Sequence, residues 1–457
     1  MVFIRKEFNK EADTMVKNMT EGNPIKHIIL FALPLFAGNI FQQRYNFADA
    51  AIVGRFVSAN ALAAVGASGS MMFFLISLIM GLTNGASIII SQSFGRGVYK
   101  DLRRAVGSLY LMVSVLSVVI GAAGFLLCTP LLKLLNTPEN ILPDAAMYMK
   151  ILFCGVPAMA VYNAGSAVLR SMGNSTTPLY MLIASSIINV VLDLLFIIKF
   201  NLGVCGAAYA TVASQVICAA ACSVYIYMKR SSLYLEGMSF KTDRMMMKKL
   251  VQMGVPTALQ SSLIALGGMS VQGLVNSFGE MTMAAYTASN KIDSIAIQCV
   301  VAIGTAMSVF TGQNIGAGKV DRVRECVRKV LILQIAMCTV IAVTILCLRG
   351  VLLGAFLDES AAEAVAIGST YLSIIGIAYV ISGIMQSYLN VIRGAGDVNF
   401  SMLAGIVELA GRIIFAYLLA YLTDSATGIW IATPISWGMA CLITVLRYRS
   451  GKWRRGI

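Results

Sequence analysis

Charged side chains are scarce in this sequence. Only 12% of its 457 residues are Asp, Glu, Lys or Arg, whereas 58% are hydrophobic. An ordinary soluble domain carries about 25% charged residues. The scarcity therefore argues against a soluble protein and favours an integral membrane protein. Residues 1–25 mix charged and polar side chains and contain no apolar core of the signal-peptide type, so we expect no cleaved signal peptide.

Patterns for catalysis and metal binding are also lacking. The sequence has one histidine, His27, and no HExxH, GxSxG or Walker pattern. The ten cysteines lie mostly within apolar runs and show no CxxC spacing, so we interpret them as small core residues. The sequence therefore predicts a protein that is not an enzyme, needs no cofactor and does not use ATP.

Long apolar runs fill most of the chain. A bilayer core needs about 20 apolar helical residues per crossing, and backbone groups in lipid must be satisfied within the segment. Twelve runs meet this requirement, and they predict an all-α polytopic membrane protein. The runs cover residues 27–55, 66–94, 106–128, 146–169, 178–199, 203–228, 247–278, 283–311, 327–348, 366–392, 400–421 and 428–447.

The basic residues gather at one side of these spans. If the N-terminus is cytoplasmic, 27 of the 35 Lys and Arg residues fall in or beside the cytoplasmic tails and loops. The positive-inside rule then predicts that both termini are cytoplasmic. This bias accounts for most of the net charge of +14, so we expect no nucleic-acid partner.

The chain repeats itself at an offset of 221 to 223 residues. The stretch "SQSFGRG" at 91–97 matches "GQNIGAG" at 312–318, and "LRSMGN" at 169–174 matches "IRGAGD" at 392–397. Two copies of a six-span unit are parallel repeats, which is a transporter architecture with the substrate path between the halves. We expect an N-terminal tail at 1–26, an N-lobe at 27–228, a linker at 229–246, a C-lobe at 247–448 and a basic tail at 449–457.

The sequence resembles the multidrug and toxic compound extrusion family over nearly its whole length. The resemblance is carried in order by "FALPLFAGNIFQQRYNFADAAIVGRF", "ALAAVGAS", "SQSFGRG", "VLRSMGN", "INVVLDLLFI" and "LGVCGAAYATVASQ". It looks closer to the branch related to DNA-damage-inducible protein F. The resemblance implies two helical bundles that alternate between inward and outward openings. It also implies export of organic compounds in exchange for H⁺ or Na⁺.

Ionisable residues inside an apolar span are candidate functional residues, because a charge there is costly to bury. Asp49 shares a face of the first span with Gln42 and Asn46, and Asp193 shares a face of the fifth span with Asn189. Asp49, Asp193 and Thr211 all lie roughly 9–12 Å from the outer end of their spans, at 1.5 Å per residue. This common depth predicts one site.

The predicted site suits cation coupling. In the resembling family, the positions matching Asp49, Asn189, Asp193 and Thr211 form the cation-binding cluster of the first lobe. Two carboxylates in a low-dielectric cleft do not both ionise readily, so one can hold a proton near neutral pH and release it elsewhere. The same oxygens can ligate Na⁺, and the sequence does not choose between the ions. The plainer interpretation is a hydrogen-bonded pair that ties two spans together.

The second copy lacks this cluster. It has Glu408 and Arg412 at i, i+4, a spacing that suits an ion pair, either structural or part of a gate. Some members of the resembling family carry an acidic cation-binding site in the second lobe, but at the comparable depth this sequence has Gln260 rather than a carboxylate. Asp293 is placed near the outer start of its span, where water can reach it.

Arg44 is less expected in this family. It points about 140° away from Asp49 around the helix, so it either lines a cavity, where it disfavours cationic substrates, or is a buried structural cation. Other candidates for the substrate cavity or gate are Gln42, Asn46, Asn163 and Gln260, together with Glu408 and Arg412.

These observations favour a cation-coupled exporter of small organic compounds in a bacterial cell membrane, acting as a monomer. A flippase for a lipid-linked precursor is the alternative, but it needs several cavity-facing basic residues. Only Arg44 and Arg412 are available in the spans.

Overall fold

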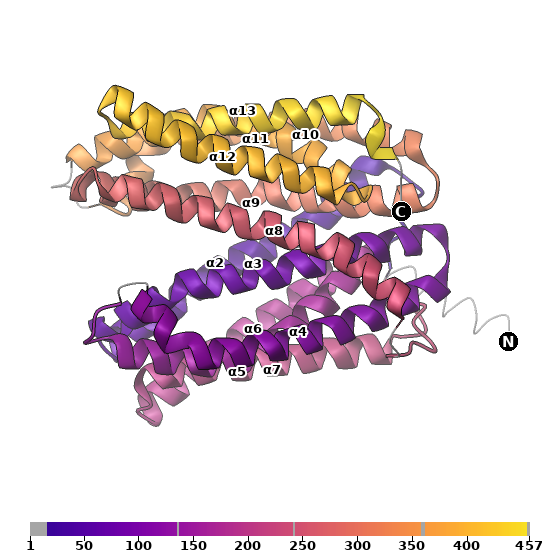
Figure 1. Cartoon of the computed structure of the whole chain (residues 1–457), viewed down its shortest axis with the longest axis horizontal. Coiled ribbons are helices and arrows are strands. Elements are labelled where there is room, and N and C mark those ends of the chain that lie inside the picture. Colours follow the sequence, from indigo (N-terminus) through magenta and orange to yellow (C-terminus); the bar gives the residue numbers. More distant parts are fainter. Residues whose placement is uncertain (1–15, 135–136, 241–242, 358–361, 455–457) are drawn as a thin grey trace. The chain divides into compact units, whose positions relative to one another are not determined.

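The computed structural model describes residues 16–134, 137–240, 243–357 and 362–454. It contains twelve helices that are long and apolar enough to cross a membrane, and the described ranges contain no strand. The predicted twelve-span, all-α architecture is therefore confirmed (Figure 1). The helices of the first half are α2 (Pro24–Phe56), α3 (Ala59–Arg96), α4 (Tyr99–Leu134), α5 (Leu142–Ser171), α6 (Thr176–Leu194), a π-helix η1 (Leu195–Lys199) and α7 (Gly203–Met228). Those of the second half are α8 (Arg244–Asn276), α9 (Glu280–Gly316), α10 (Val320–Gly354), α11 (Ala362–Gly394), α12 (Val398–Thr423), α13 (Ala426–Arg449) and a short 3₁₀ helix η2 (Lys452–Arg454).

The chain divides into two compact units. The first contains Leu33–Ala258 and the stretch that ends at Asn18, and the second contains Met19–Ala32 and Leu259–Ile457. This division differs from the expected lobes, because the chain changes unit inside α2 and inside α8 rather than in the linker. Both crossings lie next to an internal proline, Pro34 or Pro256. Proline removes a helical hydrogen bond, so it weakens the helix at these two points.

Each unit packs its helices by the same plan. In the first unit α5 lies against α3, α4 and α7, and α6 lies along α7. In the second unit α11 lies against α9, α10 and α13, and α12 lies along α13. Since the equivalent helices make the equivalent contacts, the sequence repeat corresponds to a repeat of structure.

The repeated glycines end equivalent helices. Gly97 and Gly318 follow α3 and α9 with φ of 70° and 73°, and Gly173 and Gly396 follow α5 and α11 with φ of 85° and 97°. Residues with a Cβ rarely adopt this left-handed conformation. The matched motifs of the two halves therefore mark helix ends that require glycine.

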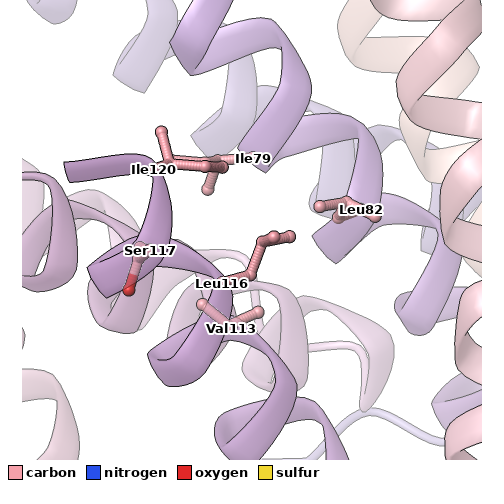
Figure 2. Close-up of a pocket in the computed structure, with 7 residues that line it drawn as sticks. Ile79, Leu82, Val113, Leu116, Ser117 and Ile120 are labelled. Carbon is pink, nitrogen blue, oxygen red and sulfur yellow. The ribbon is translucent and has the colours of Figure 1, made fainter. Parts of the chain in front are cut away.

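A small apolar cavity lies inside the first unit. Figure 2 shows Ile79 and Leu82 of α3 facing Val113 and Ile120 of α4 around it. Its volume is about 10 Å³, close to the least that one water molecule needs. The hydroxyl of Ser117 is already used, since it donates to the carbonyl of Ser114. The cavity is therefore a packing void and offers no free polar group to a ligand.

Candidate functional site

Apolar contacts fix the end of α2 that carries Asp49. Val53, one turn further along α2, is fully buried in a cluster with Tyr148 and Leu152 of α5 and Ala207 of α7. Val53 and Val57 lie one helical turn apart, so they give this end of α2 an apolar face that packs against α5 and α7. Asp49 lies four residues before Val53, so it is on the same face of α2, and it is half-buried.

Asp193 lies where α6 changes its helical form. It precedes by two residues the π-helix η1, and π-turns inside α-helices are frequent at functional sites. Gly206 at the start of α7 approaches the backbone of η1 closely, since a Cβ there would lie 3.2 Å from the carbonyl carbon of Phe196. The side chains of Asn189 and Asp193 are almost fully buried, with 1% and 0% exposure.

The four residues predicted to form one site do come together. The carboxyl groups of Asp49 and Asp193 lie within hydrogen-bonding reach of each other. The amide Nδ2 of Asn189 donates to Oγ1 of Thr211 at 3.4 Å, a long hydrogen bond. Helices α2, α6 and α7 each contribute to the cluster, as the depth argument predicted.

The cluster has more acceptors than donors. Oδ1 of Asp49, both carboxyl oxygens of Asp193 and Oδ1 of Asn189 are buried and receive no hydrogen bond from the described residues. Such orphaned acceptors are rare in native proteins and are unfavourable unless a proton, a water molecule or an ion satisfies them. No group of three or more His, Cys, Asp or Glu side chains suited to a metal occurs in the described part of the chain. A cation here would therefore be held by mixed carboxylate, amide and hydroxyl oxygens.

Two tyrosines of the cluster were missed from the sequence. Tyr45 lies one turn before Asp49 on α2, within hydrogen-bonding reach of Thr211 and close to both carboxyl groups. Tyr148 of α5 is 6% exposed and also lies near both carboxyl groups. The i, i+4 spacing from Asp49 could have indicated Tyr45, but no sequence signal distinguished Tyr148.

The other candidates of the first half lie outside this cluster. Gln42, Arg44 and Asn46 of α2 are exposed, so they are not part of the buried set around Asp49. Arg44 makes no ion pair or hydrogen bond with the described residues, and the alternative of a buried structural cation is wrong. The side chain of Asn163 is half-buried and donates to the carbonyl of Met159 within α5.

The second unit contains the predicted ion pair. Nη2 of Arg412 lies 3.0 Å from Oε1 of Glu408, which confirms the i, i+4 pairing. The indole N–H of Trp437 on α13 donates to the same oxygen at 3.2 Å. Asp293 is half-buried and accepts a hydrogen bond from the hydroxyl of Tyr379 on α11, and the expectation that water can reach it stays a prediction.

Gln260 is held in a polar network within the second unit. Its side chain is 2% exposed, and Oε1 accepts hydrogen bonds from Nη2 of Arg393 at 2.8 Å and from the hydroxyl of Ser401 at 3.1 Å. Arg393 is the next-to-last residue of α11. Gln260 therefore lies near the end of α11 that leads to α12.

The fold and the buried polar cluster together define a polytopic α-helical membrane transporter built from two copies of a six-helix unit. The family model MatE matches residues 34–195 and 256–418, one match in each copy. The chain belongs to the MatE family, which is a family of transporters and not of enzymes. The narrower placement beside DNA-damage-inducible protein F stays a prediction.

Several known proteins are similar over almost the whole chain. The probable multidrug resistance protein YpnP of Bacillus subtilis (strain 168) is 32% identical over 448 residues, which are 96% of this chain and 97% of that protein. The FAD transporter of Shewanella oneidensis is 24% identical over 428 residues, which are 92% of this chain and 94% of that protein. The structure of a MOP superfamily transporter from Pyrococcus furiosus matches with a TM-score of 0.89 at 23% identity, covering 96% of this chain and 99% of that one.

Proposed function

We propose that this transporter is a secondary active exporter, in which entry of H⁺ or Na⁺ drives the export of small organic compounds by alternating access. The observation that carries the proposal is the buried pair of carboxyl groups at Asp49 and Asp193, whose oxygens lack donors. The coupling ion is a co-substrate here. It would bind when the cluster opens to one side of the membrane and leave when it opens to the other.

Either ion suits the residues present. Two neighbouring carboxylates that share one proton satisfy each other, and uptake of that proton removes one buried charge. Hard cations prefer oxygen ligands, and the carboxylates together with the Asn189 amide and the Thr211 hydroxyl offer them. Names of relatives such as YpnP support multidrug export as the transported class. The positive-inside bias supports cytoplasmic termini, and we expect a monomer in the cell membrane.

The test is transport by the full chain in liposomes loaded with a cationic dye, with a proton gradient and a sodium gradient imposed separately. One of the two gradients is expected to drive dye movement. Efflux that ignores both gradients would exclude antiport.

Matched variants locate the coupling site. Asp49→Asn and Asp193→Asn should each abolish ion-driven transport while the protein still folds, because the charge is lost but the shape is kept. Asp321→Asn is the control, since the Asp321 side chain is 91% exposed and lies at the start of α10. Wild-type transport by either site variant would show that Asp49 and Asp193 are not the coupling site.

A second substrate class is favoured by Arg44. An exposed guanidinium that has no carboxylate partner among the described residues attracts anions. One relative is named an FAD transporter, and FAD is an anion. The flippase alternative has weaker support, because Arg412 is already paired with Glu408. Arg44→Gln should raise transport of cationic dyes relative to anionic ones. An unchanged preference would remove Arg44 from substrate selection.

A further inference from the structure

A groove of about 700 Å³ lies on the first unit, away from the carboxyl cluster. Helices α4, α5 and α7 form its walls, and the loop that follows α7 closes one side. Most of the lining is apolar, including Leu111, Val161, Ile226 and Phe240. The size is in the range of small-molecule and lipid sites. Phe240 is 59% exposed, so the groove presents an aromatic side chain at its open edge.

The rim of the groove is basic. The guanidinium of Arg230 lies 4.3 Å from the centre of the Tyr227 ring, and its Nη1 donates to the Tyr227 carbonyl at 3.0 Å. Nε of Arg103 on α4 donates to the carbonyl of Tyr234 in the same loop at 3.1 Å. No ion pair of either arginine occurs among the described residues. The lining has no acidic side chain, although Glu236 is exposed in this loop.

The walls of the groove extend at least about 10 Å below this rim along α4 and α7. Tyr110 follows Arg103 by seven residues on α4, and Ser223 precedes Arg230 by seven residues, which corresponds to about 10 Å at 1.5 Å per residue. The hydroxyl of Tyr110 is buried and points towards Gly165 of α5, where a Cβ would lie 2.9 Å from it, so only the rest of this side chain borders the groove. The groove thus has an arginine at its rim and mainly apolar side chains below it, with Ile226 and Tyr227 between Arg230 and Ser223.

We propose that this groove binds one anionic phospholipid of the cytoplasmic leaflet. A phospholipid would place its phosphate beside Arg230 and an acyl chain along the apolar lining, which includes Leu111 and Val161. Basic pockets between membrane helices on the cytoplasmic side recognise such headgroups. Arginine suits a phosphate because its donors match two oxygens at once. The positive-inside rule assigns this basic end to the cytoplasmic side.

The lipid would also order the loop that leads from α7 towards α8. Tyr227 of α7 and Phe240 of the following loop both line the groove. A lipid bound there would therefore contact both α7 and the loop. Binding to the folded chain alone raises its stability by mass action. The occupied groove should therefore show a higher unfolding temperature.

The test uses the full chain purified in detergent, with phosphatidylglycerol or phosphatidylcholine of the same acyl chains added. Phosphatidylglycerol should raise the unfolding temperature of the wild type more than phosphatidylcholine does, and native mass spectrometry should retain one phosphatidylglycerol per chain. Arg230→Gln should weaken phosphatidylglycerol binding about fivefold, the effect of one cation at the membrane surface. Arg328→Gln is the control, because Arg328 is an exposed arginine of α10 outside the groove.

A second variant tests the apolar part. Ser223→Trp fills the groove from its half-exposed wall and should abolish retention of both lipids. Equal stabilisation by the two lipids, or equal loss of phosphatidylglycerol in Arg230→Gln and Arg328→Gln, would overturn the proposal. So would full retention of phosphatidylglycerol by folded Ser223→Trp protein.

Discussion

The ion pair of the second unit allows a quantitative prediction. Glu408 and Arg412 are joined at 3.0 Å, their side chains are 11% and 20% exposed, and Trp437 donates to the same carboxylate. Glu408→Leu would remove this acceptor from the guanidinium and from the indole N–H, and Asp293 would remain as the nearby carboxylate. Removing one partner of a buried pair costs about 3–5 kcal/mol, and a lone arginine in the middle of a membrane helix costs about 2.5–3.5 kcal/mol. Since Arg412 keeps some exposure, we expect Glu408→Leu to lower the free energy of unfolding by about 2–3 kcal/mol.

The double variant distinguishes a lost attraction from an uncompensated charge. Glu408→Leu with Arg412→Leu removes both charges of the pair. It leaves the indole N–H without its acceptor and Asp293 without the nearby guanidinium. We expect it to recover most of the loss, to within about 1 kcal/mol of the wild type, because apolar replacements of a buried pair are often neutral. The measurement is the free energy of unfolding of all variants in mixed micelles, with Trp437→Phe as the control for the hydrogen bond, worth about 1 kcal/mol.

If Glu408→Leu is no less stable than Trp437→Phe, or if the double variant is the least stable of the set, an unpaired Arg412 is not the main cost. Transport provides the second readout. A structural pair predicts that the double variant still transports in liposomes. A gate predicts that it folds but has lost transport, which would favour the second interpretation of the pair.

Two further changes follow from the packing and from the carboxyl cluster. Gly124→Ala on α4 should lower the unfolding temperature, because the new Cβ would lie 2.0 Å from the ring of Phe153 and overpacking costs about 1–3 kcal/mol. Gly350→Ala on α10 should leave the unfolding temperature unchanged or raise it slightly. The new Cβ meets no atom within 4 Å, and the helix loses a glycine from its interior. Tyr45→Phe should weaken ion-driven transport several-fold and leave folding intact, because only a hydroxyl near Thr211 is lost. Unchanged transport in Tyr45→Phe would separate the hydroxyl from coupling.

Helix positions were predictable because the membrane imposes a length on every span. The first run was expected at 27–55 and α2 covers Pro24–Phe56, while the sixth matches α7 at both ends. The fifth run was expected as one helix, but its last five residues form the π-helix η1. No amino-acid composition is typical of i→i+5 hydrogen bonds, so the sequence did not indicate the π-helix. We attribute it to the packing of α6 on α7.

The unit boundaries were less predictable than the helices. A basic linker suggested a division at 229–246, whereas the chain changes unit beside Pro34 and Pro256. The repeat had already paired these prolines at an offset of 222. Sequence composition indicates where a helix ends, but the partner against which each part of a helix packs depends on three-dimensional contacts.

Candidate-site residues were predictable where they are polar and lie in apolar runs. Asp49 and Asp193 stand out for this reason, and equal depth was enough to place them together. Tyr148 lies at the same cluster but is an aromatic residue in an apolar helix, where aromatic residues are common. The distance of Asp293 from a helix end does not reveal that Tyr379 of another helix donates a hydrogen bond to it.

The two units have one fold but unlike chemistry around their carboxylates. In the second unit Glu408 is bound by Arg412 and Trp437, and Asp293 accepts a hydrogen bond from Tyr379. In the first unit Asp49 and Asp193 face each other, and the described residues offer their buried oxygens no donor. A carboxylate that already has partners gains little from an ion, whereas a pair without donors gains a great deal. For this physical reason we propose that ion coupling belongs to the first unit, even though the repeat supplies the same six helices twice.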